Sequence, residues 1–180
     1  MKPSAAFLSA ILFLACIALP ALALESKVFT VSEKTLSVDL GPNFEITKSQ
    51  LNTSSKGMIS QDFVINDTAG EGGAFISIME VYDGPLSKMS SRSLSEIFLV
   101  GGMSAAQARG DIEIGNWTAV DRQGENVTVH ALSTKDERIQ MLDGRYYTAV
   151  WNLDTSNYAV MVSLLDKDNT TKMIKTLTII

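Results

Sequence analysis

Residues 145–165 read RYYTAVWNLDTSNYAVMVSLL, two apolar runs separated by a polar break from Asp154 to Asn157. In an extended chain successive side chains point to opposite faces, so every second residue shares a face. The residues that share a face are Tyr147, Ala149, Trp151 and Leu153 in the first run, and Tyr158, Val160, Val162 and Leu164 in the second. The break has the length and polarity of a hairpin loop. We predict two antiparallel strands joined by a turn.

The opposite faces of this hairpin are apolar as well, at Tyr146, Val150, Met161 and Leu165. Strands that are apolar on both faces are typical of the middle of a sheet with both sides covered. The pattern therefore predicts an α+β fold. In this fold an antiparallel β-sheet carries one longer helix in mid-chain and a short C-terminal helix.

The composition is that of a folded, mildly acidic protein. The chain has 180 residues, 46% of them hydrophobic, with 15 basic and 20 acidic side chains and a net charge of −5. This length fits one domain, and the apolar content argues against disorder. A net negative charge gives no electrostatic reason to bind nucleic acid or an anionic membrane.

The N-terminus has the pattern of a secretory signal peptide. Lys2 is followed by an apolar run from Ala5 to Leu19, then by Pro20 and the small-residue motif Ala21-Leu22-Ala23. This order predicts cleavage after Ala23, with residues 24–180 forming a single exported domain. The alternative is an uncleaved membrane anchor over residues 5–24, which is nearly long enough to span a bilayer. Both interpretations place the domain outside the membrane.

The only cysteine, Cys16, lies inside this N-terminal segment. A lipoprotein, acylated at Cys16, is a further alternative, although the preceding Phe13-Leu14 fits it poorly. After cleavage the chain would contain no cysteine. Disulfides, a thiolate nucleophile and zinc–thiolate sites are therefore not expected in the mature protein.

Asparagine is concentrated in Asn-x-Ser/Thr motifs, which include five of its eight occurrences. These glycosylation candidates are Asn52, Asn66, Asn116, Asn126 and Asn169. We expect all five at strand ends, turns or a helix start, where a glycan can be attached. The alternative explanation is that Asn and Thr both favour turns.

The first half of the chain predicts short strands around Val28–Phe29, Leu36–Leu40, Phe44–Ile46, Ile59–Ile65 and Ala74–Tyr82. A turn is expected at 41–43, and a polar loop from Gln50 to Gly57. The glycine-rich segment 66–73 lacks the Gly-Lys-Ser/Thr ending of a phosphate-binding loop, and no helix pattern follows it. We interpret it as a wide hairpin loop.

The mid-chain helix is predicted from Ser93, where Ser93-Leu94-Ser95-Glu96 has the spacing of a capping box. Apolar and small residues follow at helical spacing up to Ala108, and Gly110 is a stop signal. We expect about 15 residues of helix. Gly101 and Gly102 indicate either close approach to the sheet or a break.

The second half predicts a meander of strands around Asp111–Arg122 (with a bulge at Gly115), Asn126–Ser133 and the central hairpin. A charged connection is expected at 134–143. The last expected element is a short helix capped by Asp168-Asn169-Thr170 and bearing Met173, Ile174, Leu177 and Ile180.

Four segments carry a resemblance to a known superfamily: 40–46 (LGPNFEI), 115–119 (GNWTA), 144–147 (GRYY) and 158–165. Together with the element order, they resemble the PsbP/Mog-like superfamily, which includes the photosystem subunit PsbP, the Ran-binding Mog protein and bacterial DcrB-type domains. The resemblance implies an α/β/α sandwich. It implies no function, because such folds host unrelated roles, and no Ran-binding or manganese-binding residue matches this sequence.

Residues for catalysis are sparse. His130 is the only imidazole, and no nucleophile motif accompanies it, so we expect a surface or packing histidine. One histidine is a poor basis for zinc. The segment 166–170 is similar to the start of a calcium loop, but Thr171 and Leu177 occupy its glycine and glutamate positions, which favours a helix cap.

Carboxylates and aromatic residues leave further possibilities open. Asp111 and Glu113 share a strand face, and we interpret them as solvated residues of an edge strand. A catalytic pair of carboxylates, as in glycosidases, stays an alternative, because such a pair forms in three dimensions and leaves no spacing pattern in the sequence. Tyr82, Tyr146 and Trp117 would form a recognition patch if exposed, but core packing is the commoner fate of aromatic residues.

The sequence therefore favours an exported, non-enzymatic module that binds a protein or cell-envelope component outside the membrane. No catalytic residue, metal ligand or cofactor is predicted. A carboxylate-dependent hydrolase is one alternative, and a small-molecule or ion-binding protein is the other.

Overall fold

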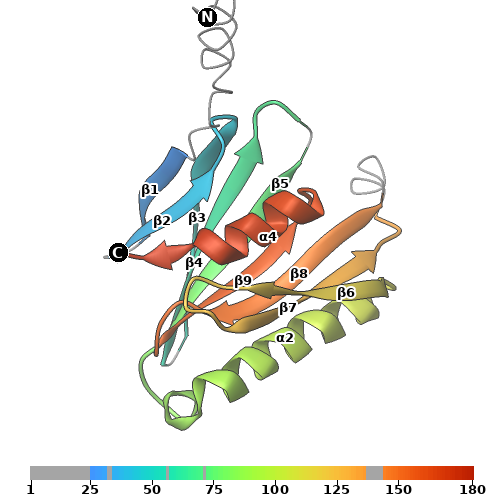
Figure 1. Cartoon of the computed structure of the whole chain (residues 1–180). Coiled ribbons are helices and arrows are strands. Elements are labelled where there is room, and N and C mark those ends of the chain that lie inside the picture. The colour runs from blue at the N-terminus through green and yellow to red at the C-terminus, as the bar shows by residue number, and fades with distance from the viewer. Residues whose placement is uncertain (1–24, 32–33, 56, 71, 137–143) are drawn as a thin grey trace, which may run out of the picture.

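The computed structural model describes residues 25–31, 34–55, 57–70, 72–136 and 144–180, without the side chains at 25, 31 and 48–54 (Figure 1). Within these ranges there are two α-helices, a short 3-10 helix and ten strands. In chain order these are β1 (Glu25–Val31), β2 (Lys34–Leu40), β3 (Phe44–Ser55), β4 (Met58–Asp67), β5 (Gly73–Val81), η1 (Leu86–Lys88), α2 (Ser91–Ala108), β6 (Ile112–Val120), β7 (Asn126–Ser133), β8 (Arg145–Asn152), β9 (Asn157–Ser163), α4 (Lys167–Thr176) and β10 (Thr178–Ile179).

The strands form two antiparallel sheets. The larger one has seven strands in the order β3-β4-β5-β9-β8-β7-β6, and the smaller one has three in the order β1-β2-β10. The predicted hairpin of 145–165 is β8–β9, in which Val150 pairs with Val160, and it lies in the middle of the larger sheet. The α+β fold with a longer mid-chain helix and a short C-terminal helix is therefore confirmed. The division into two sheets was not predicted.

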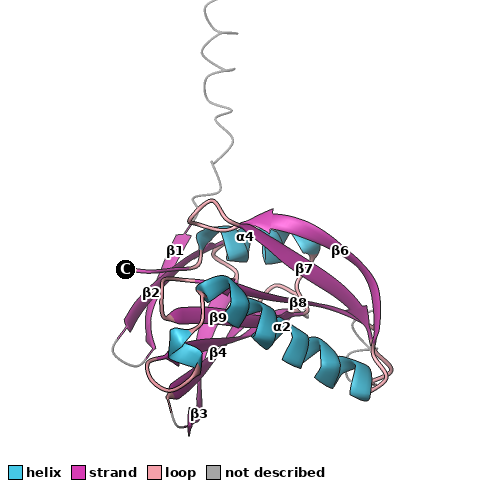
Figure 2. Cartoon of the chain, turned by 90° about the horizontal axis from the view of Figure 1, so that it is seen from below, coloured by secondary structure: helices cyan, strands magenta, loops and turns pink. Residues whose placement is uncertain are grey.

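The two faces of the larger sheet carry different elements. Helix α2 crosses one face, whereas α4 and the small sheet lie over the other (Figures 1 and 2). We call these the α2 face and the α4 face. Residues of β8 and β9 alternate between them as predicted: Trp151 and Met161 join the core under α4, while Tyr146 and Tyr158 pack with α2.

The largest core cluster fills the α4 face. It includes fully buried side chains from β2, β4, β5, β7, β9 and α4, among them Leu36, Phe63, Ile76, Val129, Met161 and Ile174. Two smaller clusters lie on the α2 face, around Leu94 with Tyr158 and around Ala106 with Leu132 and Tyr146. Burial of apolar area of this extent is the main stabilising contribution to a fold of this size.

Helix α2 differs from its prediction at its start and at its two glycines. Its N-cap lies three residues before the predicted Ser93, because the Ser90 hydroxyl accepts a hydrogen bond from the Ser93 amide at 3.2 Å. The helix continues through Gly101 and Gly102, which are exposed and would meet nothing within 4 Å if they carried a Cβ. They mark neither a break nor a close approach, because they face solvent.

Two other segments correct the sequence-based boundaries. The stretch 50–55, predicted as loop, belongs to β3, an edge strand paired only with β4 and bulged between Lys48 and Asn52. Leu177 to Ile180 do not continue the last helix. Thr178 and Ile179 pair with β2, as their β-branched side chains favour, and Ile180 is exposed.

The N-cap of helix α4 lies two residues before the predicted one. The carboxylate of Asp166 accepts a hydrogen bond from the Asn169 amide at 2.7 Å, so Asp166 is the N-cap. Asn169 also donates its side-chain amide to Asp166 at 2.8 Å. The segment 166–170 is therefore a helix cap, as its departure from the calcium-loop pattern indicated.

Candidate functional site

A groove of about 650 Å³ opens on the α2 face, between the N-terminal half of α2 and the β7–β8 strands. It forms because α2 crosses the sheet obliquely and leaves part of β7 uncovered (Figure 2). The groove is lined by Arg92, Ser95, Glu96 and Leu99 of α2, by Asp121, Gln123 and Glu125 of the β6–β7 turn, by Asn126, Val127 and Thr128 of β7, and by Val150, Trp151 and Asn152 of β8.

Hydrogen bonds hold the walls of the groove in place. Ser95 donates its hydroxyl to the Asn152 side-chain oxygen at 2.6 Å, which joins the helix to the sheet. Gln123 donates its side-chain amide to the backbone oxygen of Leu153 at 2.7 Å, which joins the β6–β7 turn to the β8–β9 hairpin. The groove is thus bounded by three chain segments that are distant in sequence.

The acidic residues of the groove are not arranged as a catalytic pair. Asp121 is buried, and its carboxylate accepts the backbone amides of Gln123 at 2.8 Å and Glu125 at 2.9 Å, which closes the turn. Glu125 is exposed, and Glu96 contacts Arg92 at 3.3 Å with both side chains largely in solvent. The groove therefore offers hydroxyl, amide and exposed charged groups, which suit binding by hydrogen bonds.

His130 lies on the α2 face but does not line the groove. Its Nδ1 is 2.8 Å from the Glu113 Oε1 atom, and Asn116 donates its amide to the same oxygen at 3.3 Å. The hydrogen bond with His130 lowers the pKa of Glu113, and the bond from Asn116 acts in the same direction, against the effect of burial. The His130 side chain is partly buried, at 17% exposure, and it bonds to a neighbouring strand, in agreement with the predicted surface or packing histidine.

The prediction that Asp111 is a solvated edge residue was wrong. Asp111 is buried, and its carboxylate accepts hydrogen bonds from the Tyr146 hydroxyl at 2.7 Å and from Arg109 at 3.1 Å. Burial alone would raise the pKa of Asp111, but hydrogen bonds from Thr134 and Tyr146 and the charge of Arg109 leave it lowered. Burial and the Asp111 contact raise the pKa of Tyr146 to about 12. This network fixes the end of α2 to the sheet.

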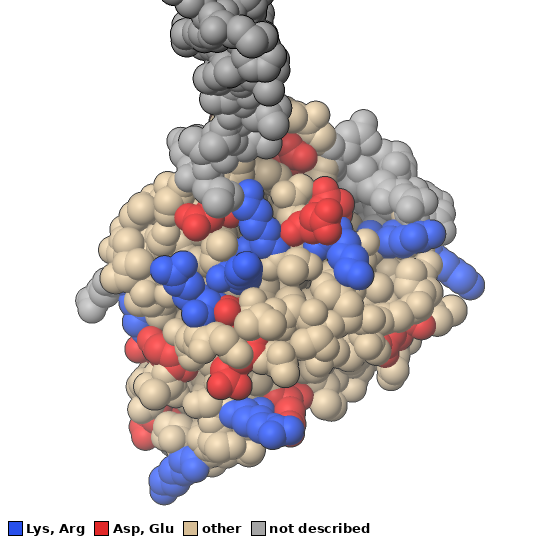
Figure 3. All heavy atoms as spheres, viewed as in Figure 1, with Lys and Arg blue, Asp and Glu red and all other residues tan. Residues whose placement is uncertain are grey.

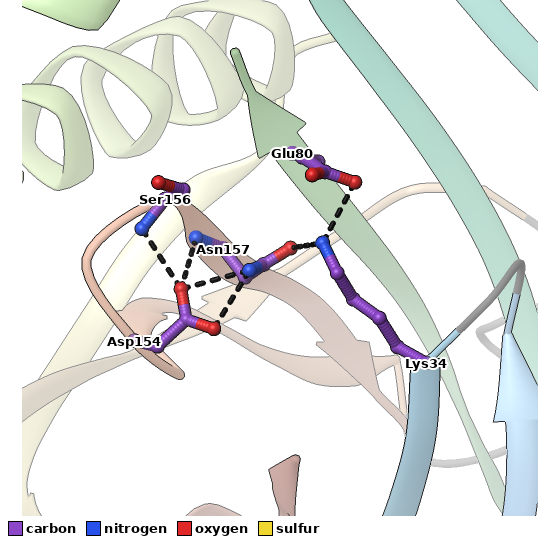
Figure 4. Close-up of polar contacts among 5 residues, drawn as sticks. All are labelled: Lys34, Glu80, Asp154, Ser156 and Asn157. Atoms are coloured by element: carbon purple, nitrogen blue, oxygen red, sulfur yellow. Dashed lines mark hydrogen bonds and ion pairs between the residues drawn. The ribbon is translucent and has the colours of Figure 1, made fainter.

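A second polar network joins the two sheets at the β8–β9 turn (Figure 4). Asn157 is buried and donates its amide to both oxygens of Asp154 at 2.8 Å, while its side-chain oxygen accepts from the Lys34 ammonium at 2.6 Å. Lys34 also forms an ion pair with Glu80 at 2.7 Å. Lys34 belongs to β2 of the small sheet, so this cluster ties that sheet to the larger one.

Of the three aromatic residues considered for recognition, only Tyr82 is exposed. Tyr146 is buried, and Trp117 packs edge to face on Tyr147 with ring centroids 4.9 Å apart. Trp117 also donates its indole N–H to Thr171 at 3.1 Å, below the Lys167 ammonium. Packing is thus the role of two of these three residues.

The glycosylation candidates occupy varied positions. Asn66, Asn116 and Asn126 are exposed, Asn126 at the groove, and Asn169 is half-buried at the start of α4. Asn52 lies in β3, with its side chain outside the described part of the chain. Asn52 and Asn116 stand inside strands, contrary to the expectation that all five lie at strand ends, turns or a helix start.

In the described ranges no group of three or more His, Cys, Asp or Glu side chains is arranged to hold a metal ion. None of the helices there combines the length and apolar character needed to cross a membrane. The predicted signal peptide or anchor, residues 1–23 or 5–24, lies outside the described residues. On the face shown in Figure 3, basic and acidic side chains are interspersed.

The chain was compared with protein-family models, curated proteins and solved structures, and no match was found in any of the three.

The sequence assigned a functional role to no residue of the groove except the glycosylation candidate Asn126, and it named Ser95, Glu96, Val150 and Trp151 only as structural residues. The lining side chains are common polar residues from α2, a turn and two strands, and they follow no spacing along the chain. The Asn-Val-Thr motif at Asn126 is the only local signal near this site.

Proposed function

We propose that this protein is an exported binding module, which uses the groove beside α2 to hold a segment of a protein or cell-envelope component. The observation that carries the proposal is the mixed lining of the groove, where polar side chains such as Ser95, Gln123, Thr128 and Asn152 occur together with the apolar side chains of Leu99 and Val150. Polar groups placed among apolar ones in a concave site fix the orientation of a bound segment. Export is proposed from the residue pattern 2–23 alone.

A carboxylate-dependent hydrolase is the less favoured alternative. Such an enzyme needs one carboxyl group poised as an acid beside another that stays ionised. In the groove, Asp121 is bound by two turn amides, and Glu96 and Glu125 extend into solvent. This arrangement supports binding over bond cleavage.

A small-molecule or ion-binding protein is the other alternative. A deep apolar pocket beside the long helix would favour it, whereas the groove is open and its lining is mixed. Membership of the PsbP/Mog-like superfamily stays a proposal. It is supported by the layered arrangement of helix, sheet and helix and by the four-strand meander β6–β9.

The proposal is tested by filling the groove. Thr128 is exposed on β7 and lines the groove, so Thr128→Trp should block a bound segment without disturbing the core. A photo-crosslinking amino acid at position 128 should capture a component of the envelope fraction. The captured component, once purified, should raise the melting temperature of the unmodified protein, because a ligand that binds only the folded state stabilises it.

Thr118 provides the matched control. It is exposed, pairs directly with Thr128 across β6 and β7, and does not line the groove. Thr118→Trp should bind the component as the unmodified protein does, whereas Thr128→Trp should lose binding at least tenfold, or about 1.4 kcal/mol. Equal binding by both variants would refute the groove as the site. Release of a cleavage product would instead support the hydrolase.

A further inference from the structure

The outward side of α2 carries no charge over three turns. Residues 97–108 read IFLVGGMSAAQA, a run without Asp, Glu, Lys or Arg. Within it Ile97 is 45% exposed and Val100 63% exposed, and the small residues Gly101, Ser104, Ala105 and Ala108 are exposed too. A surface helix normally presents charged and polar side chains to solvent. An uncharged outward side indicates that it packs against something.

The sheet adds apolar surface beside this helix. Phe75 and Val162 are cross-strand neighbours on β5 and β9, and they are 40% and 38% exposed. Val162 lies on the α2 face between Tyr158, which packs edge to face with Phe98, and Leu164, which packs near Met103. The outer patch, as we name it, consists of Ile97, Val100, Gly101, Ser104, Ala105, Ala108, Phe75 and Val162.

We propose that the outer patch binds the outer patch of a second copy of this chain, with the two α2 helices antiparallel across a two-fold axis. The size of the side chains along α2 carries this choice of partner. Within the run 97–108, the large residues Ile97 and Val100 are in the N-terminal half, and the small residues Ser104, Ala105 and Ala108 are in the C-terminal half. A two-fold contact must be complementary to itself, and only an antiparallel pairing places each large side chain against a small one.

The pairing has a defined register, with the axis between Gly102 and Met103. In this register Ile97 meets Ala108 of the second copy, and Val100 meets Ala105 of the second copy. Gly101 meets Ser104 of the second copy at the centre. Small residues at the crossing let the helix axes approach closely, because the separation of packed helices depends on the side chains between them.

Charge complementarity supports the same register. It brings Glu96, at the N-terminal edge of the outer patch, opposite Arg109 of the second copy at the C-terminal edge. The Arg109 side chain is 62% exposed although one of its nitrogens holds Asp111, and Glu96 is 65% exposed beside Arg92. The existing exposed pair with Arg92 is weak, so Glu96 is available to a second cation.

Sedimentation velocity of the purified protein over a concentration series tests the association. A helix pair with two flanking side chains is small beside the ~1,200–2,000 Å² that stable interfaces bury, so the dimer should form in the micromolar range. Val100→Glu should weaken dimerisation at least tenfold while leaving the thermal unfolding of the monomer unchanged. Ile180→Glu, which alters an equally exposed residue outside the outer patch, should dimerise normally. A protein that stays monomeric throughout the series, or a Val100→Glu variant that dimerises normally, would overturn the proposal.

Cysteine crosslinking tests the direction of pairing in a Cys16→Ser background. Ile97→Cys combined with Ala108→Cys should form an intermolecular disulfide on oxidation, because the register places these positions together. Ile97→Cys alone should not crosslink, because the two copies of position 97 would stand about 16 Å apart along the helix axes. Rapid crosslinking of the single variant would indicate a parallel pair and refute the two-fold antiparallel arrangement.

Discussion

The two faces of the seven-stranded sheet are covered to different extents. On the α4 face, α4 and the small sheet together enclose a continuous core from Leu36 to Leu177. On the α2 face a single α-helix, with the short η1 beside it, covers two small clusters and leaves a groove on one side and exposed apolar residues on the other. The α4 face therefore provides most of the stability, and the α2 face provides surface for binding.

The difference follows from how much area each layer can cover. One helix is about 10–12 Å wide with its side chains, which spans only two or three strands at ~4.8 Å spacing. The α4 face gains the extra width of β1, β2 and β10, whereas within the described residues the α2 face gains only the short helix η1, whose Leu86 packs on the Leu94 cluster. Four predictions test this division, from the largest expected effect to the smallest.

Met161 and Val162 are consecutive residues of β9 that point to opposite faces. Met161 is fully buried on the α4 face, so Met161→Ala should lower the free energy of unfolding by about 2–5 kcal/mol. Val162 is 38% exposed on the α2 face, and Val162→Ala should cost less than about 1 kcal/mol. Urea denaturation of both variants makes the comparison. Similar losses would contradict the unequal coverage of the two faces.

Asn157 and Asn152 are bonded asparagines at the two ends of the β8–β9 turn. Asn157→Ala removes the buried link between Lys34 and Asp154 and should destabilise the protein by about 1–3 kcal/mol. Asn152→Ala removes a bond to Ser95 at the groove, where water can replace the side chain, and should cost less than about 1 kcal/mol. Chemical denaturation measures the free energy of unfolding of both variants. A larger loss of stability for Asn152→Ala than for Asn157→Ala would contradict the conclusion that the α4 face provides most of the stability.

The pH dependence of stability tests the contribution of Tyr146, which is buried on the α2 face. Its pKa rises from 10.0 in the unfolded reference to about 12 in the folded protein, so the unfolded chain loses this proton first. The resulting stabilisation is complete below pH 10 and is lost as the pH rises towards 12. Tyr146→Phe should cost about 1 kcal/mol at neutral pH, because the bond to Asp111 is lost.

Unfolding measured from neutral to alkaline pH distinguishes the two proteins. The wild type should lose stability relative to Tyr146→Phe between pH 10 and 12, so the gap between them narrows. A constant gap over this range would show that the pKa of Tyr146 is not raised in the folded protein.

The glycines of α2 give the smallest effect, and it is a stabilising one. Gly101 and Gly102 face open space, so Gly101→Ala or Gly102→Ala should raise the free energy of unfolding by about 0.5–1 kcal/mol through helix propensity. Gly110 ends the helix with a φ of +87°, and Gly110→Ala should destabilise. Thermal melts at one fixed protein concentration compare the three. Destabilisation by Gly101→Ala would indicate that its outward side is already packed.

Most of the fold followed from local patterns. Alternation in 145–165 predicted β8 and β9, and apolar residues on both faces predicted their central position, because side-chain direction in a strand is fixed by backbone geometry. Boundaries were less accurate where several serines compete as caps, as at Ser90 and Ser93, or where an edge strand is polar, as in β3. The interpretation of Gly101 and Gly102 as a close approach or a break was also wrong, since both face solvent on an outward side that carries no charged residue between 97 and 108.

The candidate site could not be predicted from local sequence patterns. Asp111 and Glu113 are two residues apart, yet Asp111 is buried with Tyr146 while Glu113 pairs with His130 near the surface. Their different roles depend on the position of the α2 end and of β7, which no spacing records. The groove likewise combines residues 92–99, 121–128 and 150–152 only after α2 lies across the sheet.

The sequence by itself determined most of the strands, the two α-helices and the buried side chains of the central hairpin, because these depend on backbone geometry and on the transfer of apolar groups from water. The tertiary structure alone decided that the first strands form a separate sheet over α4, and that α2 leaves a groove and an apolar outward side. These features depend on how much of each sheet face the helices and the small sheet can cover. That area is a property of the whole folded chain and not of any local segment.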